Sequence, residues 1–126
     1  MFKKTLKSGS AVFQYLDLWS SIYTWGGMAP PGEGELAVIG PNQHIYFDAF
    51  STPILKGIII QGGSLIFDDT HDVSLSLEYL LILGAGKFQV GTAEVPFQHQ
   101  ANITMYGSVR SVELPIFGSK VTFVFN

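Results

Sequence analysis

The hydrophobic positions between Gly57 and Thr92 follow a unit that occurs twice. In each copy an apolar strand leads into a glycine, and a second apolar strand follows it. A shift of 23 positions (86 − 63) aligns the following pairs: Gly63 with Gly86, Ile58 with Leu81, Ile60 with Leu83, Leu65 with Phe88, and Phe67 with Val90. A repeat of this length built from strands predicts a solenoid in which each repeat forms one coil.

The same pattern extends beyond this stretch in both directions. Upstream, an offset of 22 aligns Leu36, Val38 and Gly40 with Ile58, Ile60 and Gly62. An offset of 20 then aligns Ile45 and Phe47 with Leu65 and Phe67. The corner at Pro41–His44 is therefore predicted to be two residues longer than the corresponding corner of the next coil. Downstream, an offset of 23 aligns Leu80, Ile82 and Gly84 with Ile103, Met105 and Gly107. The sequence therefore predicts an all-β fold of four imperfect coils joined by parallel strand pairing. An antiparallel sandwich is the alternative, because its short strands and turns also recur regularly.

Glycines and tryptophans are the expected structural residues. Gly63 and Gly86 are predicted to occupy equivalent corners with positive φ, which glycine adopts without steric cost. Trp19 and Trp25 precede a Gly/Pro-rich loop and are predicted to cap one end of the solenoid. A platform on which sugars stack is the functional alternative for these two rings. The structural set is completed by Gly62, Gly84, Gly91 and Gly107.

The loop FDDTHDV, from Phe67 to Val73, holds the densest group of acids. Its spacing does not match a calcium loop, which needs alternating acids, a central glycine and a terminal glutamate. We therefore expect a solvated turn and no metal site. The candidate acids for glycan hydrolysis are Asp48, Asp68, Asp69 and Asp72. Asp68 and Asp69 are adjacent and should diverge to opposite faces of an extended segment, whereas glycosidases need two carboxyl groups across a cleft.

Two further polar residues have readable chemistry. His99 has no serine, cysteine or second histidine nearby in sequence to form a nucleophile–base pair, so we expect a surface or hydrogen-bonding role. Asn102 opens the sequon Asn-Ile-Thr, a candidate N-glycosylation site in a secreted chain. Strand alternation places Asn102 and Thr104 on the face opposite Ile103 and Met105. An unmodified strand asparagine is equally compatible with this pattern.

Composition narrows the function classes. Apolar residues make up 47% of the 126 residues and charged residues 13%, which fits coils buried between neighbouring coils and argues against disorder. The net charge of −3 and the absence of a basic cluster after the first seven residues argue against nucleic-acid binding. The chain contains no cysteine, so the fold needs no disulfide. No apolar run is long enough to span a bilayer, and the first residues are a poor signal peptide.

Five segments together resemble the eight-glycine (G8) domain of animal cell-surface proteins. They lie within residues 18–121 and are the Trp-Ser-x-x-x-Thr-Trp run from Trp19, PPGEGE from Pro30, IQGGSLIF from Ile60, FQVGTAEVPFQHQANITMYGS from Phe88, and ELPIFGSKV from Glu113. Within that family the pattern is most similar to the fibrocystin-like branch, the polycystic kidney and hepatic disease family. The domain also occurs in cell-migration-inducing and transmembrane proteins that bind hyaluronan.

The resemblance implies a right-handed parallel β-helix on the extracellular side of the plasma membrane, within a large single-pass protein. It implies a non-catalytic scaffold or interaction module without a cofactor, whose partners are further β-helix coils of the parent chain and, beyond these, an extracellular glycan or protein. The alternative is the N-terminal part of a hyaluronan-binding or hyaluronan-depolymerising protein, since depolymerisation is attributed to some members.

The resemblance also predicts the domain organisation. Residues 1–17 form a poorly defined N-terminal segment, and residues 18–126 form the G8 β-helix domain, which is expected to be truncated at its C-terminal end. The apolar run there contains Ile116, Phe117, Val121, Phe123, Val124 and Phe125. An edge strand with exposed apolar side chains is a template for another strand. We therefore expect self-association through this end when no further coil follows.

Overall fold

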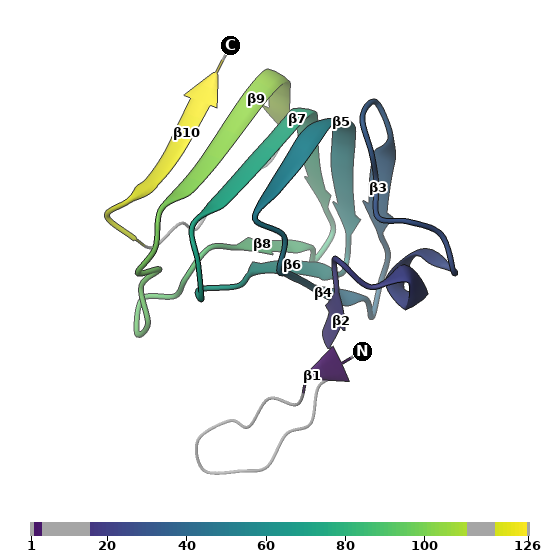
Figure 1. Cartoon of the computed structure of the whole chain (residues 1–126), viewed down its shortest axis with the longest axis horizontal. Helices are drawn as coiled ribbons and strands as arrows, with labels where there is room; N and C mark the ends of the chain where they lie inside the picture. Colours follow the sequence, from purple (N-terminus) through teal and green to yellow (C-terminus); the bar gives the residue numbers. More distant parts are fainter. Residues whose placement is uncertain (1, 4–15, 111–117, 126) are drawn as a thin grey trace.

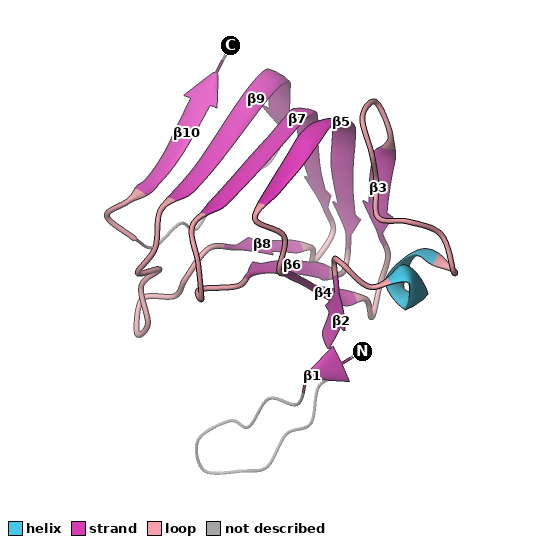
Figure 2. Cartoon of the chain, in the orientation of Figure 1, coloured by secondary structure: helices cyan, strands magenta, loops and turns pink. Residues whose placement is uncertain are grey.

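The structure is a computed structural model that describes residues 2–3, 16–110 and 118–125. Apart from one short 3-10 helix, the regular secondary structure of these residues is β-strand (Figures 1 and 2). Most of the N-terminal segment 1–17, together with Ile116 and Phe117, lies outside the described residues. The elements are β1 (Phe2–Lys3), β2 (Leu16–Leu18), the 3-10 helix η1 (Ile22–Trp25), β3 (Leu36–Ile39), β4 (His44–Phe47), β5 (Ser51–Gln61), β6 (Ser64–Phe67), β7 (Val73–Leu83), β8 (Lys87–Gln89), β9 (Ala101–Arg110) and β10 (Val121–Phe125).

The strands form two five-stranded sheets, ordered β1-β2-β4-β6-β8 and β10-β9-β7-β5-β3. Every pairing except the antiparallel contact of β1 with β2 is parallel. Successive coils stack on one another to give a β-solenoid of about four turns. The predicted parallel β-helix is therefore confirmed, and the antiparallel sandwich is wrong.

Each of the long strands β5, β7 and β9 rises along one face of the solenoid, bends, and descends along another face (Figure 1). The bend changes which side chains point inward. In β5 the buried Leu55 and Ile58 lie three residues apart, and in β7 the same spacing separates the buried Leu77 and Leu80. A straight strand alternates with a period of two, so the bend shifts the inward phase by one residue.

This shift corrects the predicted register. Ala37 and Ile39 pair with Ile58 and Ile60, an offset of 21, and Ile58 and Ile60 pair with Leu80 and Ile82, an offset of 22. The predicted offsets of 22 and 23 were one residue too long. This error aligned four outward side chains with the inward Ile58 and Ile60: Leu36, Val38, Leu81 and Leu83. A slip of one residue exchanges the two faces of a strand. The pairing of β4 with β6 follows the predicted offset of 20, so the Pro41–His44 corner is one residue longer, not two.

The predicted alignment of β9 was also wrong. Ile103 and Met105 lie beside Leu75 and Leu77, an offset of 28, because the loop between β8 and β9 is longer than the earlier corners. Gly107 is consequently not a corner residue. It lies at a bulge, and a Cβ there would collide with the carbonyl oxygen of Glu78.

Aromatic rings form a column through the interior. Trp19 packs edge-on against Phe47 at 4.9 Å between ring centroids, and Phe47 stacks on Phe67 at 5.1 Å. Phe67 continues the column to Phe88 at 5.4 Å and to Phe97 at 6.3 Å. Such ring pairs add about 0.5–1.5 kcal/mol each beyond the burial of their area. The column links each coil to the next through the core.

Gly63 and Gly86 do occupy equivalent corners, since the Lys87 N–H donates to the Gly63 carbonyl oxygen at 2.9 Å. The predicted reason was wrong, because neither has a positive φ. A Cβ at Gly63 would collide with the carbonyl oxygens of Gly40 and Gln43, and one at Gly86 would lie 2.7 Å from that of Ile60. These corners therefore need glycine because the backbone of the preceding coil passes so close.

We predict that Gly63→Ala lowers the free energy of unfolding by about 3 kcal/mol, because overpacking against rigid backbone costs about 1–3 kcal/mol or more. The matched control is Gly84→Ala. Gly84 has φ +60° with no atom within 4 Å of a built Cβ, and a left-handed alanine costs roughly 1–2 kcal/mol. Urea unfolding of both variants measures the difference. A loss for Gly63→Ala no larger than that for Gly84→Ala would contradict the close approach as the reason for glycine at this corner.

Candidate functional site

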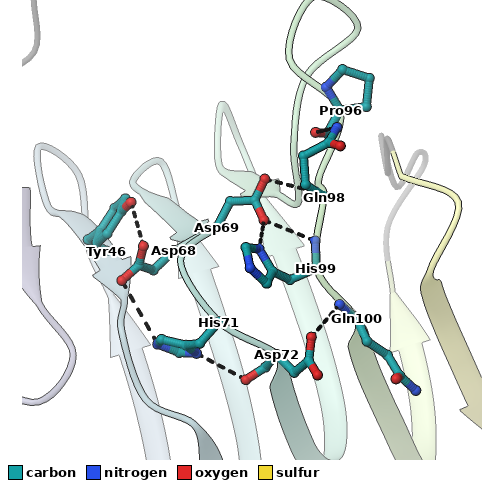
Figure 3. A network of polar contacts seen from close by, with 9 residues as sticks. All are labelled: Tyr46, Asp68, Asp69, His71, Asp72, Pro96, Gln98, His99 and Gln100. Carbon is teal, nitrogen blue, oxygen red and sulfur yellow. Dashed lines mark hydrogen bonds and ion pairs between the residues drawn. The ribbon is translucent and has the colours of Figure 1, made fainter.

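The corner loops that follow β4, β6 and β8 carry the candidate acids and their partners. Figure 3 shows three of the acids, Asp68, Asp69 and Asp72, beside the last of these loops. Asp48 lies in the first loop, and Asp68, Asp69 and Asp72 lie in the second. The third loop supplies residues 98–100. Parallel stacking places equivalent corners side by side, so each loop faces the loops of the coils before and after it.

Asp69 and Asp72 both reach forward to the third loop. The Asp69 carboxylate accepts the N–H of Gln98 at 2.8 Å and the N–H of His99 at 3.1 Å, and the Nδ1 atom of His99 lies 2.7 Å from the same carboxylate. Asp72 accepts the Gln100 N–H at 2.9 Å. These contacts tie the backbone of one corner to side chains of the previous corner, and they confirm the hydrogen-bonding role predicted for His99.

The environment of Asp69 alters its acidity. Partial burial by itself raises the pKa of this carboxyl group, but the hydrogen bonds from the His99 ring and from the Gln98 and His99 N–H groups outweigh that effect. The pKa of Asp69 is consequently lowered from 3.8. A carboxylate that accepts several N–H bonds is stabilised in its charged form.

Asp68 and Asp48 reach back to the preceding coil. The Tyr46 hydroxyl donates to Asp68 at 2.9 Å. Burial, this hydrogen bond and the nearby carboxylates raise the pKa of Tyr46 to about 12. Asp48 accepts the Ser20 N–H at 2.9 Å and the Ser20 hydroxyl at 2.6 Å. The adjacent Asp68 and Asp69 thus diverge, Asp68 to the preceding coil and Asp69 to the following one, whereas the sequence predicted divergence to opposite faces of one segment.

His71 fills the space between these acids. Its Nδ1 atom lies 3.0 Å from the Asp72 carbonyl oxygen, and its Nε2 atom lies 3.2 Å from the Asp48 carbonyl oxygen and 4.0 Å from the Asp68 carboxylate. The Phe50 ring stacks on the imidazole at 4.1 Å. His71 therefore connects the first corner to the second.

The arrangement is suited to joining coils rather than to chemistry. Each of the four candidate acids accepts at least one hydrogen bond from another coil or from its corner loop. Across residues 2–3, 16–110 and 118–125, no three His, Cys, Asp or Glu side chains are grouped so as to hold a metal ion. Within the same residues, no buried side-chain nitrogen or oxygen lacks a hydrogen-bond partner. The carboxylates at these corners are thus hydrogen-bonded to groups of neighbouring corners.

The tryptophans form the predicted cap. Trp19 is 2% exposed and lies in the core, which rules out its use as a sugar platform. The Trp25 ring meets it edge-on at 5.0 Å, and the Trp25 Nε1–H donates to the Trp19 carbonyl oxygen at 2.8 Å. The Thr24 hydroxyl donates to the Leu18 carbonyl oxygen at 2.6 Å and fixes the turn that carries both rings.

Asn102 lies on β9 with its side chain half-buried on the outer face, while Ile103 and Met105 are buried. The Gln100 side-chain amide donates to the Asn102 side-chain oxygen at 3.3 Å. Among the structural glycines, Gly62, Gly84 and Gly91 have positive φ. No helix in the described part of the chain is long and apolar enough to cross a membrane.

Comparison with known sequences places this solenoid in a family. The sequence model of the G8 domain matches residues 24–126, so the chain belongs to the G8 domain family. The G8 domain is not a catalytic family, and membership supports the prediction that this chain is not an enzyme. No solved structure matches the chain.

The relatives are much longer proteins. Fibrocystin-L of Homo sapiens is 51% identical over 118 residues, and fibrocystin of Mus musculus is 33% identical over 118 residues. Each match covers 94% of this chain and 3% of the relative. The chain is thus similar to a small segment of large fibrocystin-family proteins.

Several members of the corner network carry no readable signal in the sequence. Tyr46 and Ser20 lie 22 and 28 residues from the aspartates they contact, and the Gln98 and Gln100 contacts use backbone N–H groups. A correct alignment of the coils would have predicted these contacts, because it places the residues of neighbouring corners side by side.

We predict that Asp69→Asn lowers the free energy of unfolding at pH 7 by about 2 kcal/mol, since a hydrogen bond to a charged group contributes roughly 1.5–3 kcal/mol. A lowered pKa in the folded state means that the contribution is complete above pH 3.8 and is lost as the pH falls through the lower folded value. The variant should therefore lose less stability in acid than the parent chain. Thermal melts from pH 7 to pH 2 test this, with Asp72→Asn, which accepts one backbone N–H, as the control. Identical acid profiles for parent and Asp69→Asn would contradict the prediction.

Proposed function

We propose that this chain is a non-catalytic scaffold and interaction module on the extracellular side of the plasma membrane, within a large fibrocystin-like receptor-type protein with a single membrane span. The observation that carries this proposal is the commitment of all four candidate acids to contacts that hold the corners together. Membership of the G8 family and similarity to fibrocystin-L support the setting.

The alternative function is the processing of hyaluronan. A glycosidase needs two carboxyl groups facing each other across a substrate cleft, one of them free to transfer a proton. Asp68 and Asp69 diverge, and Asp69 and Asp72 are held by backbone N–H groups of the next corner. No observation in the described residues favours this alternative over the scaffold.

The proposed partners include further β-helix coils of the same parent polypeptide. Among the strands of the described residues, β10 pairs with β9 alone and lies at the edge of its sheet. Phe125 is 63% exposed and stacks on Phe123 at 6.2 Å between ring centroids. A parallel edge strand with an exposed ring beside it offers the next coil both a ladder of hydrogen bonds and an apolar contact.

If a further coil covers β10, the isolated chain should self-associate, whereas a longer product of the same gene should sediment as a monomer and melt at a higher temperature. Replacing Phe125 with Ser should reduce the self-association, while replacing the exposed Tyr23, at the far end of the solenoid, should leave it unchanged. Sedimentation velocity over a range of concentrations measures both. An isolated chain that stays monomeric and melts as high as the longer product would refute the proposed partner.

Asn102 is the proposed N-glycosylation site. Its side chain points to the outer face of β9, away from the buried Ile103 and Met105, so a glycan there would not disturb the core. The sequon is useful to the proposed function only if the chain enters the secretory pathway.

The proposed location and the proposed modification are tested together in cells that produce the longest product of the gene with an epitope tag beside the exposed Glu33. We expect antibody to label the tag on intact cells, and a peptide N-glycosidase to lower the mass of a proteolytic fragment that contains Asn102. Asn102→Gln should remove that mass change, with Asn42→Gln as the control. Tag that is labelled only after permeabilisation would contradict the extracellular location. Hyaluronan that is shortened by the purified chain, but not by its Asp68→Asn or Asp72→Asn variant, would contradict the non-catalytic role.

A further inference from the structure

The sequon at Asn102 lies in the middle of a sheet and not in a loop. Its strand, β9, pairs with β7 on one side and with β10 on the other (Figure 1). Asn102 is in register with Ser74 on β7 and with Thr122 on β10. Ile103, at the centre of the sequon, points inward and is fully buried. The three residues that a glycosylating enzyme must recognise are therefore built into the ladders and the core.

The glycosylation reaction requires access to the whole Asn102 carboxamide. Its nitrogen attacks the anomeric carbon of an oligosaccharide that is carried on a lipid diphosphate. A C–N bond forms, the C–O bond to the diphosphate breaks, the lipid diphosphate leaves, and the nitrogen gives up one proton to a base of the enzyme. An amide nitrogen is a weak nucleophile, because its lone pair is delocalised into the carbonyl group. The enzyme must therefore surround the carboxamide to activate it.

The folded sheet leaves no room for such a pocket around Asn102. Atoms of a pocket wall would contact the carboxamide at about 3.5–4.0 Å, whereas the adjacent strands already lie about 4.8 Å away on either side. Ser74 and Thr122 occupy these two positions. Along the strand, the Gln100 side-chain amide donates to the Asn102 side-chain oxygen at 3.3 Å. In the folded chain the carboxamide is thus flanked within its own sheet and is open only outward.

A glycan that is attached before folding is compatible with the same surface afterwards. The neighbours of Asn102 in its row of outward side chains, Ser74 and Thr122, are small and carry hydroxyl groups. The bulkier outward residues of this region, Ile54 and Val124, lie in the next row along the strands. A glycan can therefore extend outward over small side chains while β9 docks on β7.

We propose that the oligosaccharide is transferred to Asn102 only before β9 docks on β7, so that the pace of this docking regulates the occupancy of the site and the folded domain is not a substrate. β7 precedes β9 in the chain, so docking can follow as soon as β9 has been synthesised. Docking buries Ile103 and Met105 and ends the period in which the enzyme can bind the sequon. The inference rests on the proposed function, since only a chain in the secretory pathway meets this enzyme.

The test uses the chain of 126 residues, produced without glycans, folded, and kept at a concentration at which it sediments as a monomer. It is incubated with a purified eukaryotic oligosaccharyltransferase and a lipid-linked oligosaccharide, and mass spectrometry measures the glycosylated fraction. We expect transfer to be at least about a hundredfold slower than to a peptide spanning residues 98–108. Opening an interior strand costs a free energy close to the global stability, and about 2.8 kcal/mol already corresponds to a hundredfold.

A variant that loosens the docking of β9 should be a better substrate. Leu75 on β7 is fully buried and pairs in register with Ile103. Leu75→Ala should raise the rate of transfer to Asn102 by about tenfold or more, because the loss of a buried leucine side chain makes opening easier. Circular dichroism checks that this variant is still folded at the temperature of the assay.

A sequon in an exposed loop is the matched control. Gly26→Asn with Met28→Thr creates one across residues 26–28, all of which are exposed, in a chain that also carries Asn102→Gln. Gly26 has φ +66° with no atom within 4 Å of a built Cβ, and asparagine tolerates a left-handed φ better than most residues. We expect transfer to this loop sequon in the folded chain to be at least about tenfold faster than to Asn102, since loops open at little cost.

The outcomes separate this inference from the proposed function. Transfer to Asn102 of the folded chain at the rate of the peptide would overturn the inference and leave the proposed function standing. Equally slow transfer to the loop sequon would also overturn it, because the sheet would then not be the cause, and so would an unchanged rate in a folded Leu75→Ala variant. An epitope tag that is labelled only after permeabilisation would refute the proposed function instead, whatever the rates of the purified chain.

Discussion

The close approach of successive backbones at one corner is the constraint on which the rest of the structure depends. At Gly63 and Gly86 the chain passes so near the carbonyl oxygens of the previous coil that a single methyl group would collide with them. This contact keeps the coils at the spacing of a parallel ladder, so that rings stack inside and corner loops meet outside. The aromatic column and the aspartate network are both consequences of that spacing, because each needs equivalent residues of neighbouring coils within contact distance.

The repeat architecture could be predicted from the sequence, because a strand–glycine–strand unit that recurs every 20–23 residues has few explanations other than a coil. The side chains that point into the core could not be predicted in the same way. At the bend of β7, Glu78 and Tyr79 both lie outside the core between the buried Leu77 and Leu80. The predicted offset of 23 therefore aligned Ile58 with Leu81, whereas the chain pairs Ile58 with the buried Leu80. The error was concealed because the outward Leu81 and Leu83 are as hydrophobic as the inward Leu80 and Ile82. The site was harder to predict than the fold. The sequence identified four aspartates, but their partners lie 22–30 residues away and several are backbone groups.

The aspartates illustrate how a group that is typical of catalysis or metal binding can serve stability instead. In a solenoid each corner leaves backbone N–H groups that no strand satisfies, and a carboxylate from the adjacent coil accepts them. Charge is retained because the hydrogen bonds stabilise the ionised form of Asp69, which also makes the joint sensitive to acid. For a module with a structural role, this placement holds the coils together and fixes their register, since neighbouring acids bind the preceding coil and the following coil.

The cap formed by Trp19 and Trp25 has a consequence for how the molecule is made. Its two rings are six residues apart and are joined by the hydrogen bond from the Trp25 Nε1–H to the Trp19 carbonyl oxygen, so this contact can form locally before the ring of Trp19 packs against Phe47 of the next coil. Every later strand then pairs with one that lies about 20–29 residues earlier in the chain. The cost of closing such loops grows only slowly with their length. A nascent chain leaving the ribosome can therefore add its coils one at a time onto this cap. The order of synthesis then coincides with the order in which the coils stack.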